Sequence, residues 1–278
     1  MKNIKIVTDS SADVLKLNGM SFEFAPLKII TAEKEYVDDQ NLDVKGMVED
    51  LQNYKGKSST SCPNASDWLE AFGDAENIFC VTITGTLSGS YNAAVLAKET
   101  YEEQHPERKV FVLNSLSAGP ELRLMIEKVQ ELVEAGLEFD TVCDEVQKYT
   151  KKTGLFFMLE SMKNLANNGR VSPLVAKMAG LLGIRVVGKA SDRGDLEPLN
   201  KCRGEQKALE TIVQYLKASG LKEGKVRIAH CFNERAGKQL KEKILAELSK
   251  ARVELYECRG LCSFYAEKGG MLVAFERM

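Results

Sequence analysis

"VTITGTLSGSYNAA", residues 81–94, carries the chain from a buried strand into a helix within a few residues. Val81 to Thr84 are apolar or β-branched, as expected of a strand, and the residues from Tyr91 onward read as the first turns of a helix. The corner between them holds only Gly, Thr, Leu and Ser, with no Lys or Arg. Such a corner is typical of a ligand site, because the first N–H groups of a helix have no partner within the helix.

The same alternation of strand and helix extends over the first half of the chain. The expected strands are 4–7, 22–30, 78–84 and 110–113, and the expected helices include 122–133 and 139–149. The strands are nearly continuous hydrophobic runs, which indicates that helices cover both faces of their sheet. Residues 1–153 are therefore predicted to form a doubly wound parallel α/β domain that carries the ligand-binding loops.

The composition changes after residue 153. Residues 154–188 are rich in Phe, Met, Leu, Ala and Gly and contain few charges. They are followed by a helix at 205–219, a strand at 225–231, a further helix from about 236 to 248, and two closing strands. We predict a second, α+β domain over 154–278, packed closely on the first because no flexible linker separates them.

Bulk properties exclude several classes of protein. A chain of 278 residues fits two domains or one unusually large one, and 38 basic against 40 acidic residues give no reason to expect nucleic acid as a partner. We find no apolar run of the roughly 20 residues that span a bilayer and no signal-peptide core, so we expect a cytoplasmic protein without stable membrane insertion. The seven scattered cysteines show neither a metal-ligand spacing nor a disulfide framework. No metal and no cofactor are expected.

Four loops follow the expected strands or precede helices, at 8–13, 58–66, 84–90 and 114–119. Loops at the carboxyl ends of parallel strands meet in one crevice, so these hydroxyl-rich segments predict a site for a small anion. Since no Lys or Arg accompanies them, a single carboxylate fits better than a polyphosphate. Asp9, Ser10, Asn64 and Ser88 are, taken singly, equally well explained as helix N-caps.

The sequence motifs of nucleotide-binding enzymes and of serine hydrolases are missing. The chain has no Gly-x-Gly-x-x-Gly after its first strand and no Walker-type Gly-Lys-Ser/Thr segment. Ser88 does not stand in a Gly-x-Ser-x-Gly elbow, and His230 ends a strand where a hydrogen-bonded core role is expected. A serine hydrolase built on Ser88 and His230 stays open as an alternative, and so does a binding protein for a different small carboxylate or phosphate.

Six segments taken in order resemble the DegV family and cover essentially the whole chain. They are "KIVTDSSADV" (5–14), "TSCPNASDWLEAF" (60–72), "TGTLSGSYNAA" (84–94), "NNGRVS" (167–172), "RGEQKAL" (203–209) and "GGMLVAFE" (269–276). The resemblance implies a two-domain fatty-acid-binding protein that is not catalytic alone. Some members of this family are the lipid-binding subunit of bacterial fatty acid kinase and present the fatty acid to a separate, ATP-dependent kinase subunit that forms the acyl phosphate.

The resemblance also implies a set of site residues. The family's carboxylate ligands match Thr60 and Ser88, and the residues expected near them are Ser61, Gly89, Ser90, Ser115, Arg170 and Tyr265. Tyr265 stands where family members often have His; a phenol still donates a hydrogen bond but is neutral near pH 7. Arg203 also matches a family arginine and is the candidate for docking a partner.

The tail of a fatty acid needs an apolar tunnel, since each buried methylene contributes about 0.8 kcal/mol. The candidates for its wall, all of which are also explained as ordinary core, are Phe156, Phe157, Met158, Met162, Leu165, Met178, Leu181 and Leu182.

Overall fold

A four-stranded parallel sheet forms the N-terminal part of the molecule in the computed structural model, which describes residues 3–277 except 178, 180 and 181. Its strands are β1 (Ile4–Asp9), β2 (Ser21–Ala25), β6 (Asn77–Thr82) and β7 (Lys109–Asn114), in the order β2-β1-β6-β7. All three neighbouring pairs are parallel. The carboxyl ends of the strands therefore share one edge, which is where the predicted ligand-binding loops begin.

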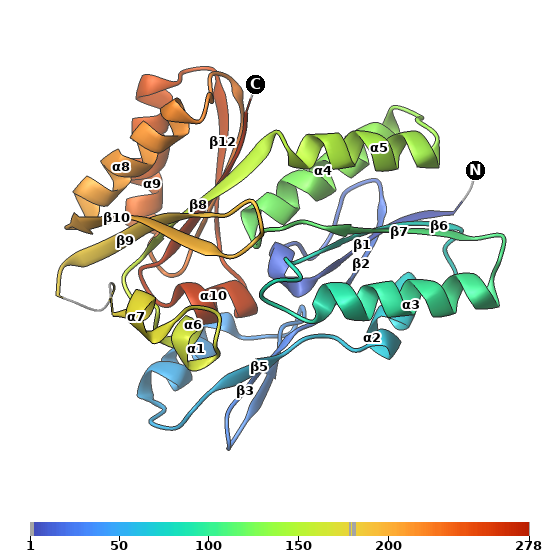
Figure 1. Cartoon of the computed structure of the whole chain (residues 1–278), viewed down its shortest axis with the longest axis horizontal. Coiled ribbons are helices and arrows are strands. Elements are labelled where there is room, and N and C mark those ends of the chain that lie inside the picture. Colours follow the sequence, from blue (N-terminus) through green and yellow to red (C-terminus); the bar gives the residue numbers. More distant parts are fainter. Residues whose placement is uncertain (1–2, 178, 180–181, 278) are drawn as a thin grey trace.

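Helices cover both faces of this sheet (Figure 1). The helices α2 (Ala65–Phe72) and α3 (Ser90–Gln104) pack on one face around the fully buried Trp68. On the other face lie α4 (Pro120–Glu134) and α5 (Phe139–Thr150), whose apolar sides meet Ile6 and Phe79. The predicted doubly wound α/β architecture is confirmed.

The segment 22–30, predicted as one strand, is two strands in two different sheets, so that prediction was wrong. Pro26 separates β2 from β3 (Lys28–Ile30), because proline cannot donate to a sheet ladder and restricts the residue before it. The strand β3 pairs with β4 (Glu35–Val37) and β5 (Ser59–Ser61) in a small antiparallel sheet, beside the helix α1 (Val44–Asn53). This arrangement places Thr60 at the end of the molecule that also holds the loops.

The C-terminal part contains a six-stranded mixed sheet in the order β10-β9-β8-β13-β11-β12, which confirms the α+β character predicted there. Its strands are β8 (Thr153–Leu159), β9 (Ile184–Ala190), β10 (Leu196–Arg203), β11 (Gly224–His230), β12 (Ala251–Glu257) and β13 (Met271–Glu276). Only β11 and β12 pair in parallel. One face is covered by α8 (Glu205–Ala218) and α9 (Glu234–Glu247). The boundary at residue 153 stays a prediction.

The helix α4 joins the two halves, since it packs against strands of both sheets. Its Glu127 accepts hydrogen bonds of 2.8 and 2.7 Å from the Arg227 guanidinium on β11, and Lys225 Nζ lies 3.0 Å away. Burial alone would raise the pKa of Glu127, but these two cations hold it below its usual range. A largely buried ion cluster thus fixes the second sheet to the helix layer of the first.

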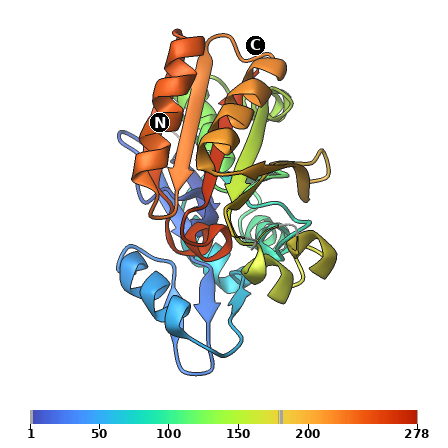
Figure 2. The ribbon, with the colours of Figure 1, turned by 90° about the vertical axis from the view of Figure 1, so that its left-hand side faces the viewer.

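Three short helices complete the fold: α6 (Lys163–Asn167), α7 (Pro173–Ala176) and α10 (Gly260–Ala266). Near the centre of Figure 2 lies α10, which comes from the C-terminal part but packs against α1, β3 and the short 3-10 turn Ser10–Ala12. Leu261 joins the core beside the parallel sheet, and Phe264 packs with Ile29 and Met47. Among the described helices, none has the length and apolarity that crossing a membrane requires.

Candidate functional site

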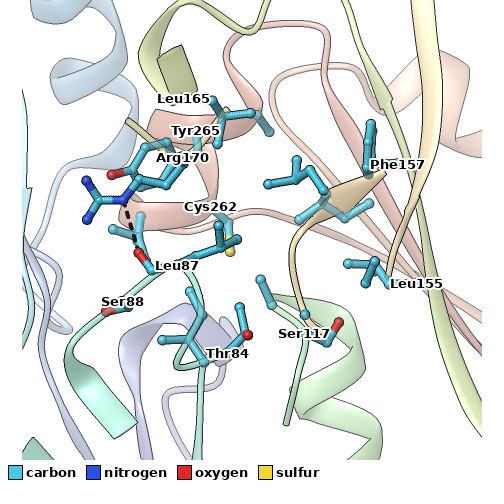
Figure 3. A pocket seen from close by; sticks show the side chains of 18 of the residues that line it. Thr84, Leu87, Ser88, Ser117, Leu155, Phe157, Leu165, Arg170, Cys262 and Tyr265 are labelled. Atoms are coloured by element: carbon cyan, nitrogen blue, oxygen red, sulfur yellow. Dashed lines mark hydrogen bonds between the residues drawn. The ribbon is translucent and has the colours of Figure 1, made fainter. Parts of the chain in front are cut away.

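A pocket lies where the loops of the parallel sheet face the second sheet and α10 (Figure 3). Most of its wall is apolar, and the Leu and Phe side chains from the second half of the chain are Leu155, Phe157, Leu159, Leu165, Leu196, Leu261 and Leu272. The β9–β10 hairpin closes one side, where Thr86 Oγ1 donates to the Arg193 carbonyl at 2.6 Å. Both halves of the chain therefore build the pocket together.

Polar groups from four separate segments gather at one end of this pocket. Thr60 comes from β5, Ser88 from the loop before α3, Arg170 from the turn after α6, and Tyr265 from α10. Thr60 Oγ1 and the Tyr265 hydroxyl are 2.7 Å apart and hydrogen-bonded. Burial raises the pKa of Tyr265, opposed by Thr60 and the Arg170 charge, so the phenol is neutral near pH 7.

Arg170 is the one cation among the described residues that line the pocket. Its Nε donates to the Leu87 carbonyl at 3.0 Å, the dashed line in Figure 3, and its NH1 donates to the Asn168 carbonyl. These two bonds fix the plane of the guanidinium beside Ser88. A carboxylate bound here would receive hydroxyl hydrogen bonds together with a charge-assisted one.

The loop that carries Ser88 is held by a carboxylate with no exposed surface, Asp9. Its Oδ2 accepts from the Ile83 N–H at 2.9 Å and from Ser90 Oγ at 2.7 Å, and its Oδ1 accepts from the N–H and hydroxyl of Ser11. Ser90 therefore supports the loop from within. Asp9 fixes the start and the end of the hydroxyl-rich corner relative to β1.

Two further acidic side chains, both buried, hold the helix that carries Tyr265. Asp38 accepts from the N–H groups of Gly260 and Leu261, both at 2.9 Å, and Asp13 accepts from the Arg259 N–H at 2.9 Å. These are first-turn N–H groups of α10, which lack partners inside the helix. The position of Tyr265 thus depends on acidic residues from the N-terminal part.

Four expected site residues do not line the pocket, for reasons visible in their bonds. Ser61 follows Thr60 in β5 and so faces the opposite side of the strand. Gly89 is the exposed N-cap of α3, and Ser90 is turned inward toward Asp9. Ser115 Oγ donates to the Ser117 carbonyl and accepts from the Ser117 N–H, both at 3.1 Å.

Successive side chains of β8 point to opposite faces of the sheet, so only some of the residues predicted to form the acyl tunnel line the pocket. Phe157 and Leu165 line the pocket, together with Leu155 and Leu159, which the sequence reasoning missed. Phe156 and Met158 point to the other sheet face, into the core beneath α8 and α9. The remaining candidates lie elsewhere: Met162 is buried in the core cluster beside Phe157, Leu182 is fully exposed, and Met178 and Leu181 lie outside the described residues.

Neither a metal centre nor a catalytic histidine is part of the pocket in the described part of the chain. No group of three His, Cys, Asp or Glu residues that could hold a metal ion occurs among the residues searched, and all seven cysteines are free. His230 is buried, its Nδ1 accepts from the Asn233 N–H at 3.3 Å, and it does not line the pocket. Arg203 is exposed at the end of β10, next to the Gly204–Gly183 backbone bond.

The fold and the pocket together define a class: an α/β protein of three sheets with a mostly apolar pocket that is polar at one end. The family model described as "Uncharacterised protein, DegV family" matches residues 3–277. A DegV domain-containing protein of Streptococcus pneumoniae is 43% identical over 276 residues, or 98% of each chain. The chain belongs to the DegV family.

Two solved structures are closely similar. The fatty acid kinase (Fak) B3 protein of Streptococcus pneumoniae, loaded with linoleic acid, has a TM-score of 0.98 at 42% identity over the full length of both chains. A DegV family protein from Eubacterium eligens, loaded with heptadecanoic acid, has a TM-score of 0.97 at 42% identity, covering 99% of this chain and 100% of that one.

Replacing Asp9 by Asn is expected to disorder the corner. Asparagine replaces one of the two accepting oxygens by an NH2 group, which faces the Ile83 N–H or the serine hydroxyls and cannot accept from them. Buried donors are then left unpaired, which lowers the free energy of unfolding by about 1–3 kcal/mol. Urea denaturation of Asp9→Asn measures this loss. The exposed Asp144→Asn serves as the matched control, and equal stability of the two variants would show that Asp9 does not hold the loop.

The stability of the α10 anchor should depend on pH through Asp13. Burial raises the pKa of Asp13 to about 7, helped by Asp38 and opposed by the Arg259 N–H and guanidinium; Tyr256, Cys231, Cys258 and Cys262 also face it. A raised folded-state pKa means that the stability contributed by neutral Asp13 is full below about pH 4 and is lost as the pH rises through about 7.

The asparagine in Asp13→Asn cannot ionise, so the variant does not share the wild type's loss of stability as the pH rises. The free energy of unfolding of the variant minus that of the wild type should therefore increase between pH 4 and pH 7, by on the order of a few kcal/mol. Urea titrations at several pH values give this difference. The exposed Asp192→Asn should keep a constant difference from wild type, and a constant difference for Asp13→Asn as well would exclude a raised pKa.

Proposed function

We propose that this protein binds a fatty acid, with the carboxylate at Thr60, Ser88, Arg170 and Tyr265 and the acyl chain along the apolar wall of the pocket. It is a binding protein and is not catalytic alone. The observation that carries the proposal is the pocket itself, apolar along most of its wall and ending in three hydroxyls and one guanidinium. A molecule with one acid group and a long apolar chain matches that distribution.

The expected binding energies agree with separate roles for the acyl chain and the carboxylate. Each buried methylene contributes about 0.8 kcal/mol, so a long chain supplies most of the affinity, while the polar end sets the direction of binding. The hydroxyls of Thr60 and Tyr265 already bond to each other, and each has lone pairs or a proton left for a ligand. Two relatives at 42% identity were crystallised with fatty acids, which supports the same ligand class here.

The alternatives fit the pocket less well. A serine hydrolase needs a base beside Ser88, but no histidine occurs among the described lining residues, and Ser88 Oγ instead accepts from the Ser90 N–H at 3.3 Å. Labelling of the protein by a fluorophosphonate, lost in Ser88→Ala, would support the hydrolase instead. A short carboxylate or a phosphate would leave the leucine-rich wall empty.

The central test is solvent extraction of the purified protein and mass spectrometry of the extract. We expect a fatty acid near one equivalent from the wild type and little or none from the Thr60→Ala, Ser88→Ala double variant, which loses two hydrogen-bond donors to the carboxylate. Ser61→Ala is the matched control, because Ser61 faces away from the pocket, and it should retain the lipid. If the stripped wild type takes up no added fatty acid, the ligand is a different one.

We further propose that the protein presents its ligand to a separate, ATP-dependent kinase subunit, as the name of the Streptococcus pneumoniae relative suggests. Arg203 is the docking candidate, since its side chain is exposed and no ion pair involves it within the described residues. With a kinase subunit supplied, Arg203→Ala should reduce acyl phosphate formation at least several-fold while fatty acid binding is kept. The exposed Arg193→Ala is the control, and equal rates for both variants would remove Arg203 from the docking surface.

A further inference from the structure

At the end of the pocket away from Arg170 and Tyr265 lies another buried polar group (Figure 3). Ser117 is 3% exposed and lines the pocket, near Leu155. Its Oγ has no hydrogen-bond partner among the described residues. Burying an unpaired hydroxyl in an apolar cavity costs free energy, and a ligand group that forms a hydrogen bond with it would remove that cost.

The hydrogen bonds that hold this loop come from the backbone of Ser117 and not from its hydroxyl. The backbone of Ser117 makes the structural contacts: its N–H donates to Ser115 Oγ at 3.1 Å, and its carbonyl accepts from the Thr84 N–H at 2.8 Å. An alanine would keep both bonds and would extend the apolar wall. The loop geometry therefore explains the backbone at this position but not the side chain.

The neighbouring groups limit what the partner is. Glu121, beside Ser117 at the start of α4, is buried and accepts from Thr153 Oγ1 at 2.7 Å, and burial raises the pKa of Glu121. The Ser117 hydroxyl lies beside this carboxyl and limits the rise of its pKa, but the two groups form no hydrogen bond of acceptable geometry. Asp195 lines the pocket and places a carboxyl group in its wall. A further acid at this end would be repelled, whereas a neutral oxygen would not.

We propose that the pocket accepts a fatty acid whose chain carries a neutral oxygen group, above all a hydroxyl, and that Ser117 binds that group. This inference rests on the proposed function, because it concerns the far end of the same ligand. A chain hydroxyl both donates and accepts, so it pairs with Ser117 Oγ without leaving its own polar atoms unsatisfied. The ligand class is then an oxygenated long-chain acid in addition to a plain one.

The test compares stearic acid with hydroxystearic acids that carry the hydroxyl at successive positions along the chain, bound to protein stripped of its lipid. At one position or a narrow range of positions, the hydroxylated acid should bind about 3- to 10-fold tighter than stearic acid, the size of one net hydrogen bond. In Ser117→Ala this affinity ratio should fall to one or below. The control Thr82→Val removes a buried hydroxyl that already donates to the Leu113 carbonyl, and it should keep the wild-type ratio.

The outcomes separate the two proposals. Wild-type protein that binds stearic acid but prefers no hydroxylated acid overturns the inference and leaves the fatty acid function intact, whether or not the variant folds. Binding of neither acid overturns both. A preference that survives in Ser117→Ala means that another group recognises the hydroxyl, which removes Ser117 from that role.

Discussion

The buried carboxylate of Asp9 is the interaction on which the site depends. Four donors from three segments converge on it, so β1, the end of β6 and the start of α3 cannot move independently. The hydroxyls of the corner then fall into two groups. Those turned inward, such as Ser90, satisfy Asp9, and those turned outward, such as Ser88, face the pocket. One buried carboxyl group thus fixes a Gly- and Ser-rich loop in place.

The same principle operates at the other wall of the pocket. Helix α10 belongs by sequence to the C-terminal part, yet its first turn is bound by Asp13 and Asp38 from the N-terminal part. The helix α4 and its Glu127 tie the second sheet to the first in the opposite direction. Neither half contains the whole site, because Thr60 and Ser88 come from one half and Arg170 and Tyr265 from the other.

The doubly wound sheet could be predicted because hydrophobic runs and helical spacing are local signals. The residues of the pocket wall were harder to predict from the sequence. In β8, Leu155, Phe157 and Leu159 face the pocket while Phe156 and Met158 face the core, and five consecutive apolar residues give no sign of which set is which. The inward turn of Ser90 is likewise invisible in the sequence, since it depends on Asp9, which lies 81 positions away.

The charge of the polar end follows from residues that no local pattern joins. The corner at 81–94 contains no cation, but Arg170 lies beside it, its Nε bonded to the Leu87 carbonyl. Tyr265 adds a donor without a charge, and its raised pKa keeps it protonated across the neutral range. Arg170 is the one cation among the described lining residues, and the proposed ligand accordingly carries a single carboxylate. A histidine in place of Tyr265 would add a group that titrates near pH 7, whereas the tyrosine leaves the polar end of the pocket without such a group at this position.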